Sequence, residues 1–261
     1  MVFSIILVSI IFFLIHHIYY WEARKTQLPP RFMAHRGIKT HSPENTIASF
    51  KDAVQFGFSG IELDLVSTKD KQLVCSHNFD LERETNGVGY INNEFYDNII
   101  NIKTGVYSHP NNTQNIPSFQ NVVDAIPDNI FLNIEIKTFK LFDLSTAKVL
   151  GKMITEHKIH HPFMISSFNP IVIAYFKMLY PDVSIGFLLQ NPEWAWVMHI
   201  IHPDYLHLRC DLISDEFLDL CHQHKLLINL WTVNSKSGIK WCNRQKKVNS
   251  IITDNSNAPS Y

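Results

Sequence analysis

Short apolar runs alternate with amphipathic runs along most of the chain, from about residue 32 to residue 254. The amphipathic runs, such as residues 169–180 and 214–225, repeat their apolar residues at helical spacing and predict helices. Strands are predicted at residues 31–37, 60–65, 71–77, 129–137, 163–168, 184–189, 204–208, 226–234 and 250–254. Strands and helices that alternate in this way form parallel sheets. About eight such units in one chain indicate a closed α/β barrel rather than an open sheet.

The first helix of this barrel is expected to begin near Pro43. Proline is favoured in the first turn of a helix, and Ser42 just before it would be the N-cap. Apolar residues then recur at helical spacing, at Ile47, Phe50 and Val54. The pattern therefore places a helix directly after the first strand.

The N-terminal segment differs from the rest of the chain, because no Asp, Glu, Lys or Arg occurs from Val2 to Tyr20. A helix that crosses a bilayer needs about 20 apolar residues. We therefore expect residues 1–22 to form one transmembrane anchor. Residues 23–31 would then be a linker, and residues 32–261 the barrel.

A cleaved signal peptide is the alternative for this segment. It would carry basic residues at its start and small residues at a cleavage site, and this sequence has neither. Tyr19, Tyr20 and Trp21 are instead typical of the aromatic belt at a membrane interface. Because Arg24 and Lys25 follow the segment, the positive-inside rule predicts a single-pass membrane protein with its barrel in the cytoplasm.

Composition excludes several classes of protein. The chain has 261 residues, 46% of them hydrophobic, which suffices for one large core. Its formal net charge of -1 gives no basic field of the kind that binds nucleic acid. The 4 cysteines contain no CxxC pair and predict neither a zinc site nor a disulfide framework. Nothing in the sequence indicates a protein partner.

Three carboxylates are expected to face the inside of the barrel. Glu62 and Asp64 are two residues apart on one predicted strand, so both point to the same face, and Glu135 repeats the pattern on a distant strand. Three inward carboxylates would repel one another strongly. A divalent cation with hard oxygen ligands, Mg²⁺ or Ca²⁺, would relieve this repulsion. The alternative is a buried ionic network with Arg36 and Lys137.

Cations and imidazoles are predicted at the same end of the barrel. Arg36 and Lys137 beside a metal suggest an anionic ligand, and arginine suits the two-point binding of phosphate. His35 and His77 each end a predicted strand, and an imidazole titrates near neutral pH. The two histidines could therefore divide general-acid and general-base work.

The chain resembles the glycerophosphodiester phosphodiesterases over nearly its whole length after about residue 32. The motifs that carry this resemblance, in order, are AHRG, PENT, GIELDL, TKD, a strand ending in His, NGVGY, IPSF, NIEIK, LWTVN and IITD. The resemblance implies a (β/α)8 TIM barrel with a short insertion after the second barrel strand, near residues 78–117.

The resemblance also implies roles for the residues of the site. His35 and His77 would be the catalytic pair, and Glu62, Asp64 and Glu135 would hold one divalent cation, with His77 as a further possible ligand. Arg36 and Lys137 would be the substrate-binding residues for the phosphate. Trp231 is a candidate for the glycerol because of its place on the last long predicted strand, and it is equally suited to a packing role.

Two positions depart from the family pattern. This chain has Asn78 after His77, where the family usually has Asp, and Glu84 where the family usually has Thr. Asparagine can hydrogen-bond to the histidine but brings no charge, so the first departure bears on activity or on metal affinity.

We therefore expect metal-dependent hydrolysis of glycerophosphodiesters to glycerol 3-phosphate and an alcohol. A lysophospholipase D that acts on membrane lysolipids is the alternative enzyme, because a membrane-bound barrel would meet such lipids directly. A catalytically weak barrel that only binds phosphodiesters is the alternative outside the enzymes, with Asn78 as the lesion.

Overall fold

The computed structural model describes residues 2–261, with side chains from residue 5 onward. Its main sheet has nine strands, of which all but β3 run parallel and close into a barrel because β1 pairs with both β11 and β2. The eight barrel strands, in order around the barrel, are β1 (Phe32–His35), β2 (Gly60–Ser67), β6 (Phe131–Ile136), β7 (Phe163–Ser167), β8 (Ile185–Leu189), β9 (Tyr205–Arg209), β10 (Leu227–Trp231) and β11 (Ser250–Thr253). The predicted TIM barrel is confirmed.

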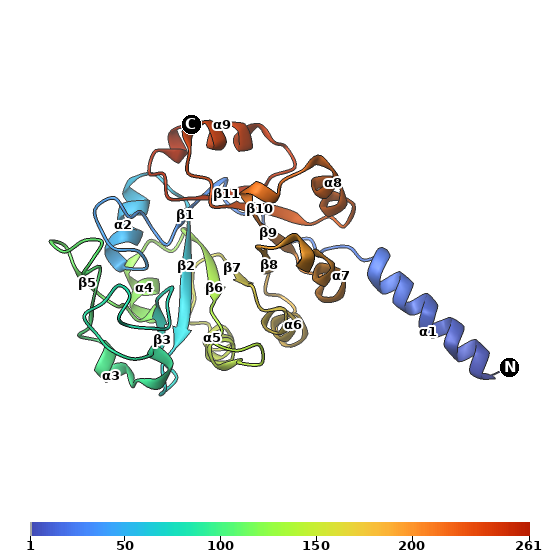
Figure 1. Cartoon of the computed structure of the whole chain (residues 1–261), viewed down its shortest axis with the longest axis horizontal. Helices are drawn as coiled ribbons and strands as arrows, with labels where there is room; N and C mark the ends of the chain where they lie inside the picture. The colour runs from blue at the N-terminus through green and yellow to red at the C-terminus, as the bar shows by residue number, and fades with distance from the viewer. Residues whose placement is uncertain (1) are drawn as a thin grey trace.

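Helices surround this ring of strands (Figure 1). The α-helices that follow barrel strands or the insertion are α2 (Ile47–Gln55), α4 (Phe119–Ala125), α5 (Ser145–Thr155), α6 (Pro170–Leu179), α7 (Met198–Ile201), α8 (Asp215–Gln223) and α9 (Lys236–Arg244). Short 3₁₀ turns occur at η2 (Pro192–Val197), η3 (Cys210–Leu212) and η4 (Ala258–Ser260). Each strand returns through a helix, as a parallel barrel requires.

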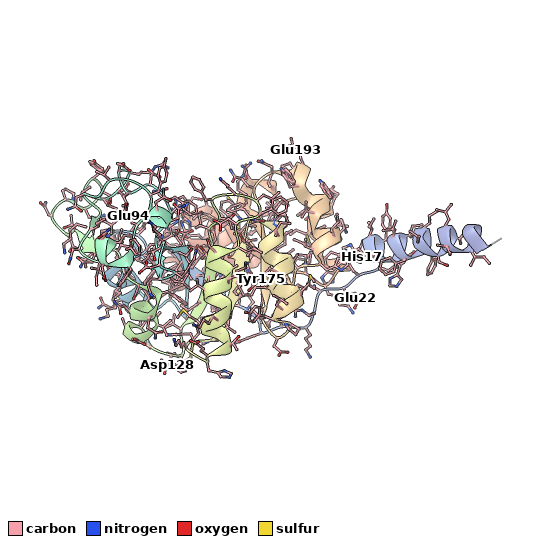
Figure 2. The ribbon with its side chains drawn as sticks, turned by 90° about the horizontal axis from the view of Figure 1, so that it is seen from below. His17, Glu22, Glu94, Asp128, Tyr175 and Glu193 are labelled. Carbon is pink, nitrogen blue, oxygen red and sulfur yellow. The ribbon has the colours of Figure 1, made fainter. Side chains whose placement is uncertain are left out.

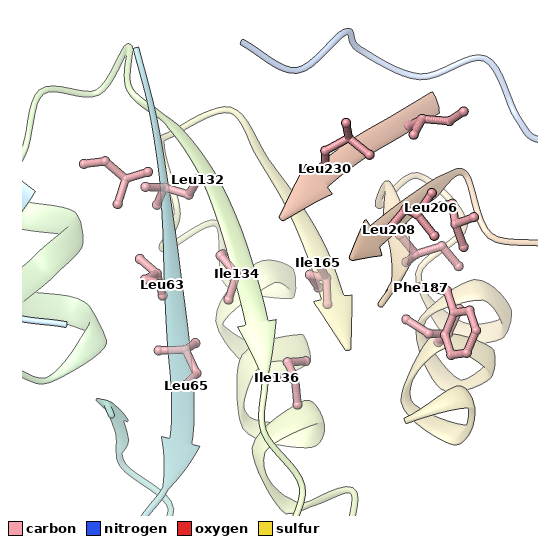
Figure 3. Close-up of a cluster of buried hydrophobic side chains, with 14 of the residues drawn as sticks. Leu63, Leu65, Leu132, Ile134, Ile136, Ile165, Phe187, Leu206, Leu208 and Leu230 are labelled. Atoms are coloured by element: carbon pink, nitrogen blue, oxygen red, sulfur yellow. The ribbon is translucent and has the colours of Figure 1, made fainter. Parts of the chain in front are cut away.

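The core lies between the barrel and these helices. Leu63 and Leu65 of β2 alternate with inward-facing acids, and Ile134 and Ile136 do the same on the neighbouring β6 (Figure 3). All four of these apolar side chains are at most 1% exposed. The period-two pattern of the sequence therefore separates an apolar outer face of the barrel from a polar inner face.

The chain does not continue around the barrel after β2 but reverses. β3 (Leu73–Cys75) pairs antiparallel with β2, so the predicted strand at residues 71–77 is not a barrel strand. The insertion that follows contains η1 (Ile91–Asn93), α3 (Tyr96–Ile99), β4 (Lys103–Thr104) and β5 (Gln114–Asn115). It packs on a small apolar cluster of its own, made by Val66, Val74, Leu81, Ile91, Ile99 and Ile116.

The predicted start of the first barrel helix is wrong. α2 begins at Ile47, and its N-cap is Thr46, whose Oγ1 accepts the backbone N–H of Ser49 at 3.2 Å. Ser49 Oγ in turn accepts the backbone N–H of Thr46 at 3.2 Å, which completes a capping box. Ser42 instead donates its hydroxyl to Asp52. The residues between Ser42 and Thr46 are thus free to form a turn at the mouth of the barrel.

The N-terminal helix α1 (Val2–Tyr19) projects sideways from the barrel (Figures 1 and 2). Among the residues that the structure describes, no helix combines the length and the hydropathy needed to cross a membrane. The transmembrane helix expected over residues 1–22 is therefore not found, and α1 has 18 residues where a span needs about 20. Met1 lies outside the described residues.

The segment after α1, residues 21–31, packs against the base of the barrel, and we call it the N-terminal strap. Trp21 is 7% exposed, and its ring stacks between His202, at a centroid distance of 4.5 Å, and His224, at 4.4 Å. Arg24 forms an ion pair with the buried Asp204 at 2.5 Å. The strap is therefore part of the folded barrel, and its packing does not depend on where α1 lies.

Candidate active site

The carboxyl ends of the barrel strands define one end of the molecule. In Figure 2, Glu94 of the insertion and Glu193 of η2 lie at this end, and Asp128, just before β6, lies at the other. His35 is the last residue of β1, and the chain then turns sharply, with a positive φ of 59° at Arg36 and 79° at Gly37. A Cβ atom on Gly37 would lie 2.5 Å from Ser49 Oγ, so only glycine fits this turn.

The three predicted acids meet at this mouth. Glu62, Asp64 and Glu135 each offer a carboxylate oxygen, and these atoms all lie within 4.8 Å of one another. Burial raises the pKa of Glu62 well above its usual value, and repulsion from Asp64 and Glu135 adds to this. Asp64 Oδ1 is buried and accepts no hydrogen bond. Clustered hard oxygens, mutual repulsion and an orphaned acceptor all fit a divalent cation.

The two predicted cations flank these acids. Arg36 Nε lies 3.2 Å from Asp64 Oδ2, and Lys137 Nζ lies 2.8 Å from Glu135 Oε1 and 3.5 Å from Asp64 Oδ1. Burial would raise the pKa of Asp64, but Lys137 and Arg36 outweigh it and lower the pKa to about 2. The ionic network considered from the sequence is therefore present. In this network the two cations Arg36 and Lys137 stand against the three carboxylates of Glu62, Asp64 and Glu135, so the cations do not neutralise all three negative charges.

Glu44 and Asn45 support the site from the turn that precedes α2. Glu44 accepts a hydrogen bond from Arg36 at 2.9 Å. Asn45 is buried, donates its Nδ2 to Asp64 Oδ2 at 2.8 Å and accepts the backbone N–H of Asp64 at 3.0 Å. Sequence reasoning assigned no role to Asn45; its φ of 56°, uncommon for a residue other than glycine, reflects the tight turn that places it.

Asp254 is a second residue whose role sequence reasoning missed. It follows β11, and its Oδ1 lies 2.8 Å from His35 Nδ1 and 2.9 Å from Lys39 Nζ. Asn234 donates to Asp254 Oδ2 at 2.7 Å. Burial raises the pKa of Asp254, but the hydrogen bonds and charges of His35 and Lys39 lower it below its usual range. An ionised Asp254 thus orients the His35 ring and leaves its Nε2 for other partners.

His77 reaches the site by a different route from the other residues. It follows the antiparallel strand β3, and Ser76 donates its backbone N–H to the carbonyl of Asp64 at 3.1 Å, which holds His77 beside β2. His77 Nδ1 lies 3.0 Å from Asn78 Oδ1. Burial lowers the pKa of His77, and the nearby Lys137 and Arg36 lower it further, against the pull of Asp64. The neutral imidazole is therefore favoured.

Trp231 lies at the end of β10, half-buried. Its Nε1 donates to the carbonyl of His207 at 2.8 Å, and its ring meets Phe168 edge-on at a centroid distance of 5.5 Å. Lys137 Nζ lies 5.9 Å from the centre of the Phe168 ring. These contacts fix the Trp231 ring and connect it, through Phe168, to Lys137.

A cavity of about 410 Å³ lies beside the acid cluster, between the turn that precedes α2 and the insertion. His77 and Arg36 line it on the barrel side, and residues of the insertion such as Glu84 and His109 line the other side. The mouth of the barrel therefore combines an acid cluster, two cations and two histidines, and Arg36 and His77 connect this site to a cavity with room for a small ligand.

A family profile described as the glycerophosphoryl diester phosphodiesterase family matches residues 35–258. The chain belongs to this family. A relative from Caldanaerobacter subterraneus, a glycerophosphodiester phosphodiesterase, is 33% identical over 233 residues, which cover 85% of this chain and 93% of the relative. The expected family and the enzyme class, a glycerophosphodiester phosphodiesterase, are confirmed.

Solved structures with the same fold include other members. A phosphodiesterase from Oleispira antarctica, in complex with the product sn-glycerol-3-phosphate, has a TM-score of 0.80 and 23% identity, and the match covers 89% of this chain and 96% of that one. A glycerophosphodiester phosphodiesterase from Agrobacterium tumefaciens has a TM-score of 0.74 and 19% identity, with 88% and 98% covered. At these identities the likeness shows the barrel fold.

Proposed function

We propose that this protein hydrolyses glycerophosphodiesters to sn-glycerol 3-phosphate and an alcohol. The observation that carries the proposal is the cluster of Glu62, Asp64 and Glu135, flanked by Arg36 and Lys137, in a chain of this family. The product that the Oleispira antarctica structure contains, sn-glycerol-3-phosphate, supports the same substrate class.

One divalent cation, Mg²⁺ or Ca²⁺, would be held by Glu62, Asp64 and Glu135. His77 as a further ligand is the alternative to its role in proton transfer, because Asn78 already engages its Nδ1 and only Nε2 remains for either task. When bound, the cation supplies charge stabilisation to the phosphoryl oxygens as they become more negative. The raised pKa of Glu62 and the Asp64 Oδ1 atom that accepts no hydrogen bond support this assignment. A bound cation would reduce the repulsion among the three carboxylates and would give Asp64 Oδ1 a partner.

The two flanking cations would orient the phosphate. Arg36 is fixed by Glu44 and Asp64, and Lys137 by Glu135, so neither side chain has to be ordered when the substrate arrives. Trp231 would flank the glycerol, with its ring held by the carbonyl of His207. The phosphate would therefore sit with its negative charge toward Arg36 and Lys137.

His35 and His77 would carry out the proton transfers. One accepts a proton from the attacking oxygen, and the other donates a proton to the leaving alkoxide. Each ring has one nitrogen engaged, His35 Nδ1 by Asp254 and His77 Nδ1 by Asn78, so that Nε2 of each ring remains for the substrate. The Asn78 side chain is placed to orient the His77 ring. Asparagine at this position therefore does not support the alternative of a catalytically weak barrel that only binds phosphodiesters.

A specific feature favours lysolipids as a second candidate substrate. A cavity of about 500 Å³ lies beside the site, and apolar side chains of Phe139, Leu141, Phe168 and Trp194 line it. Phe168 also contacts Trp231, so an acyl chain in this cavity would be continuous with the glycerol position. Lysophospholipase D activity would use the same catalytic groups.

We also propose a membrane location, with the barrel on the cytoplasmic side. Exposed apolar side chains along α1, among them Ile5, Phe12 and Phe13, support contact with lipid. The charges of Arg24 and Lys25 after the helix support the cytoplasmic side. Fractionation of cells that express the full chain, with a high-salt wash of the membranes, tests this location.

A substrate panel tests the proposed activity. The purified full chain is incubated with glycerophosphoethanolamine, glycerophosphoglycerol and a lysophospholipid, and sn-glycerol 3-phosphate or the released alcohol is measured with and without EDTA. Release of sn-glycerol 3-phosphate from a water-soluble diester supports the proposal. No turnover of any diester after supply of Mg²⁺ or Ca²⁺ would overturn it.

A further inference from the structure

The cavity beside the active site is lined by an acid that the proposed chemistry does not use. Glu84, in the insertion, lines this cavity together with Glu44 and Asp80. Glu44 lies 2.9 Å from Arg36, and Asp80 lies 3.6 Å from Arg83. Among the described residues, the Glu84 carboxylate has no Lys, Arg or His nitrogen within 4.0 Å and accepts no hydrogen bond. It is therefore a free negative charge in the cavity wall.

The backbone of Glu84 is firmly held. Its carbonyl accepts the backbone N–H of Gly105 at 2.7 Å and that of Val106 at 3.2 Å. The next residue, Thr85, is 8% exposed and donates its backbone N–H to Leu81 at 3.1 Å. The half-buried Glu84 side chain is thus presented by a fixed turn of the insertion.

The cations that would bind the phosphate lie on the barrel side of this cavity. Arg36, which follows β1, lines the cavity from the barrel side and would take the phosphate together with Lys137, which follows β6 outside the cavity lining. Glu84 lines the cavity from the insertion, as does Arg83, whose Nε lies 3.6 Å from Asp80. A substrate whose phosphate contacts the barrel wall therefore extends another part toward the insertion. A carboxylate without a partner in a half-buried position favours a positive charge at that point, because a charge-assisted contact there is only partly screened by water.

We propose that Glu84 is a specificity-determining residue that binds the ammonium group of an amino-alcohol leaving group. This inference rests on the proposed function, since it concerns the alcohol that hydrolysis would release.

Steady-state kinetics of E84Q on two diesters test this role. Glycerophosphoethanolamine carries an ammonium group, whereas glycerophosphoglycerol has a neutral alcohol. We expect E84Q to lower kcat/KM on glycerophosphoethanolamine about tenfold, mainly through KM, because glutamine keeps the shape but not the charge. On glycerophosphoglycerol, kcat/KM should stay within about twofold of the wild type. E84D, which keeps the charge, should retain most of the preference for the amine.

Asp97 provides the matched control, because it is an exposed acid of the same insertion that does not line the cavity. D97N should leave both substrates unchanged, and circular dichroism of E84Q should match the wild type. An equal loss of kcat/KM on both diesters in E84Q, or no loss on either, would overturn the role of Glu84 while leaving the phosphodiesterase activity intact. Failure of the wild type on both diesters would instead overturn the proposed function.

Discussion

His35 Nδ1 lies 2.8 Å from Asp254 Oδ1, although the two residues are 219 positions apart in the chain. They meet because β1, which ends at His35, pairs with β11, which Asp254 follows. A proposed catalytic residue and the acid that orients it therefore come from the first and the last strand of the barrel.

Asp254→Asn should lower kcat about ten- to a hundredfold, since loss of the charge weakens the orientation of His35 and the contact with Lys39. KM should change little, because Asp254 does not line the phosphate position. Steady-state kinetics on glycerophosphoethanolamine check this, with the thermal midpoint measured alongside. A wild-type kcat in Asp254→Asn would show that His35 does not depend on this contact.

Replacement of any one acid in the cluster should abolish cation binding and nearly all activity. Glu62→Ala, Asp64→Ala and Glu135→Ala each remove a hard oxygen from a set that lies within 4.8 Å. Titration calorimetry with Mg²⁺ and with Ca²⁺ measures the loss, and EDTA treatment of the wild type should have the same effect on turnover. Glu193→Ala, an exposed acid at the same end of the barrel, is the control. Full activity after complete chelation would contradict the metal assignment.

Asn78 is expected to act through its side-chain oxygen, which lies 3.0 Å from His77 Nδ1. Asn78→Ala removes this acceptor and should lower kcat about tenfold or more. Asn78→Asp keeps the acceptor and adds a charge that favours protonated His77, so it should retain at least the wild-type kcat. A kcat lower in Asn78→Asp than in Asn78→Ala would mean that the pocket does not tolerate the charge.

The N-terminal strap should lose stability in mild acid. Burial lowers the pKa of His202 to about 4, and the nearby His17 adds to this effect, so the packed strap requires the neutral ring. The unfolded His202 binds its proton near its ordinary pKa of about 6.5. Stability from this residue is therefore complete above that pH and is lost as the pH falls toward 4. Because water screens the half-buried ring, we expect a change on the order of 1 kcal/mol.

Chemical denaturation at pH 7, 6 and 5 measures this loss as a change in the free energy of unfolding. His202→Gln removes both the stacking on Trp21 and the titration, so it should be less stable at pH 7 but show a flatter dependence on pH. The exposed His222 gives the control variant His222→Gln, which should keep the wild-type slope. Parallel pH profiles for His202→Gln and the wild type would refute the role of His202.

The sequence predicted the barrel and most of the site because both depend on local periodicity. Glu62 and Asp64 had to share one face of their strand, and the apolar residues between them had to share the other. Arg36 and Lys137 follow directly from the strand ends. The metal, the division of labour between the histidines and the membrane location remain predictions.

The features that sequence reasoning missed depend on contacts between distant segments or on competing local ones. Ser42 and Thr46 are both good N-caps, and only the reciprocal bond between Thr46 and Ser49 decides in favour of Thr46. The reversal into β3 and the contact of Asp254 with His35 require the assembled barrel. The periodicity of side chains along one segment carries no information about which distant segment it will contact.

The pairing of β1 with β11 has a consequence for how the protein is made. Strands this distant in sequence pair late, because a long loop must close before they meet. During synthesis on the ribosome, the barrel stays open until the last strand has emerged, and His35 has no Asp254 beside it. A chain released before β11 is made leaves the edges of β1 and β10 unpaired. Such edges favour aggregation over folding. The active site is therefore expected to form only once the whole chain has been synthesised.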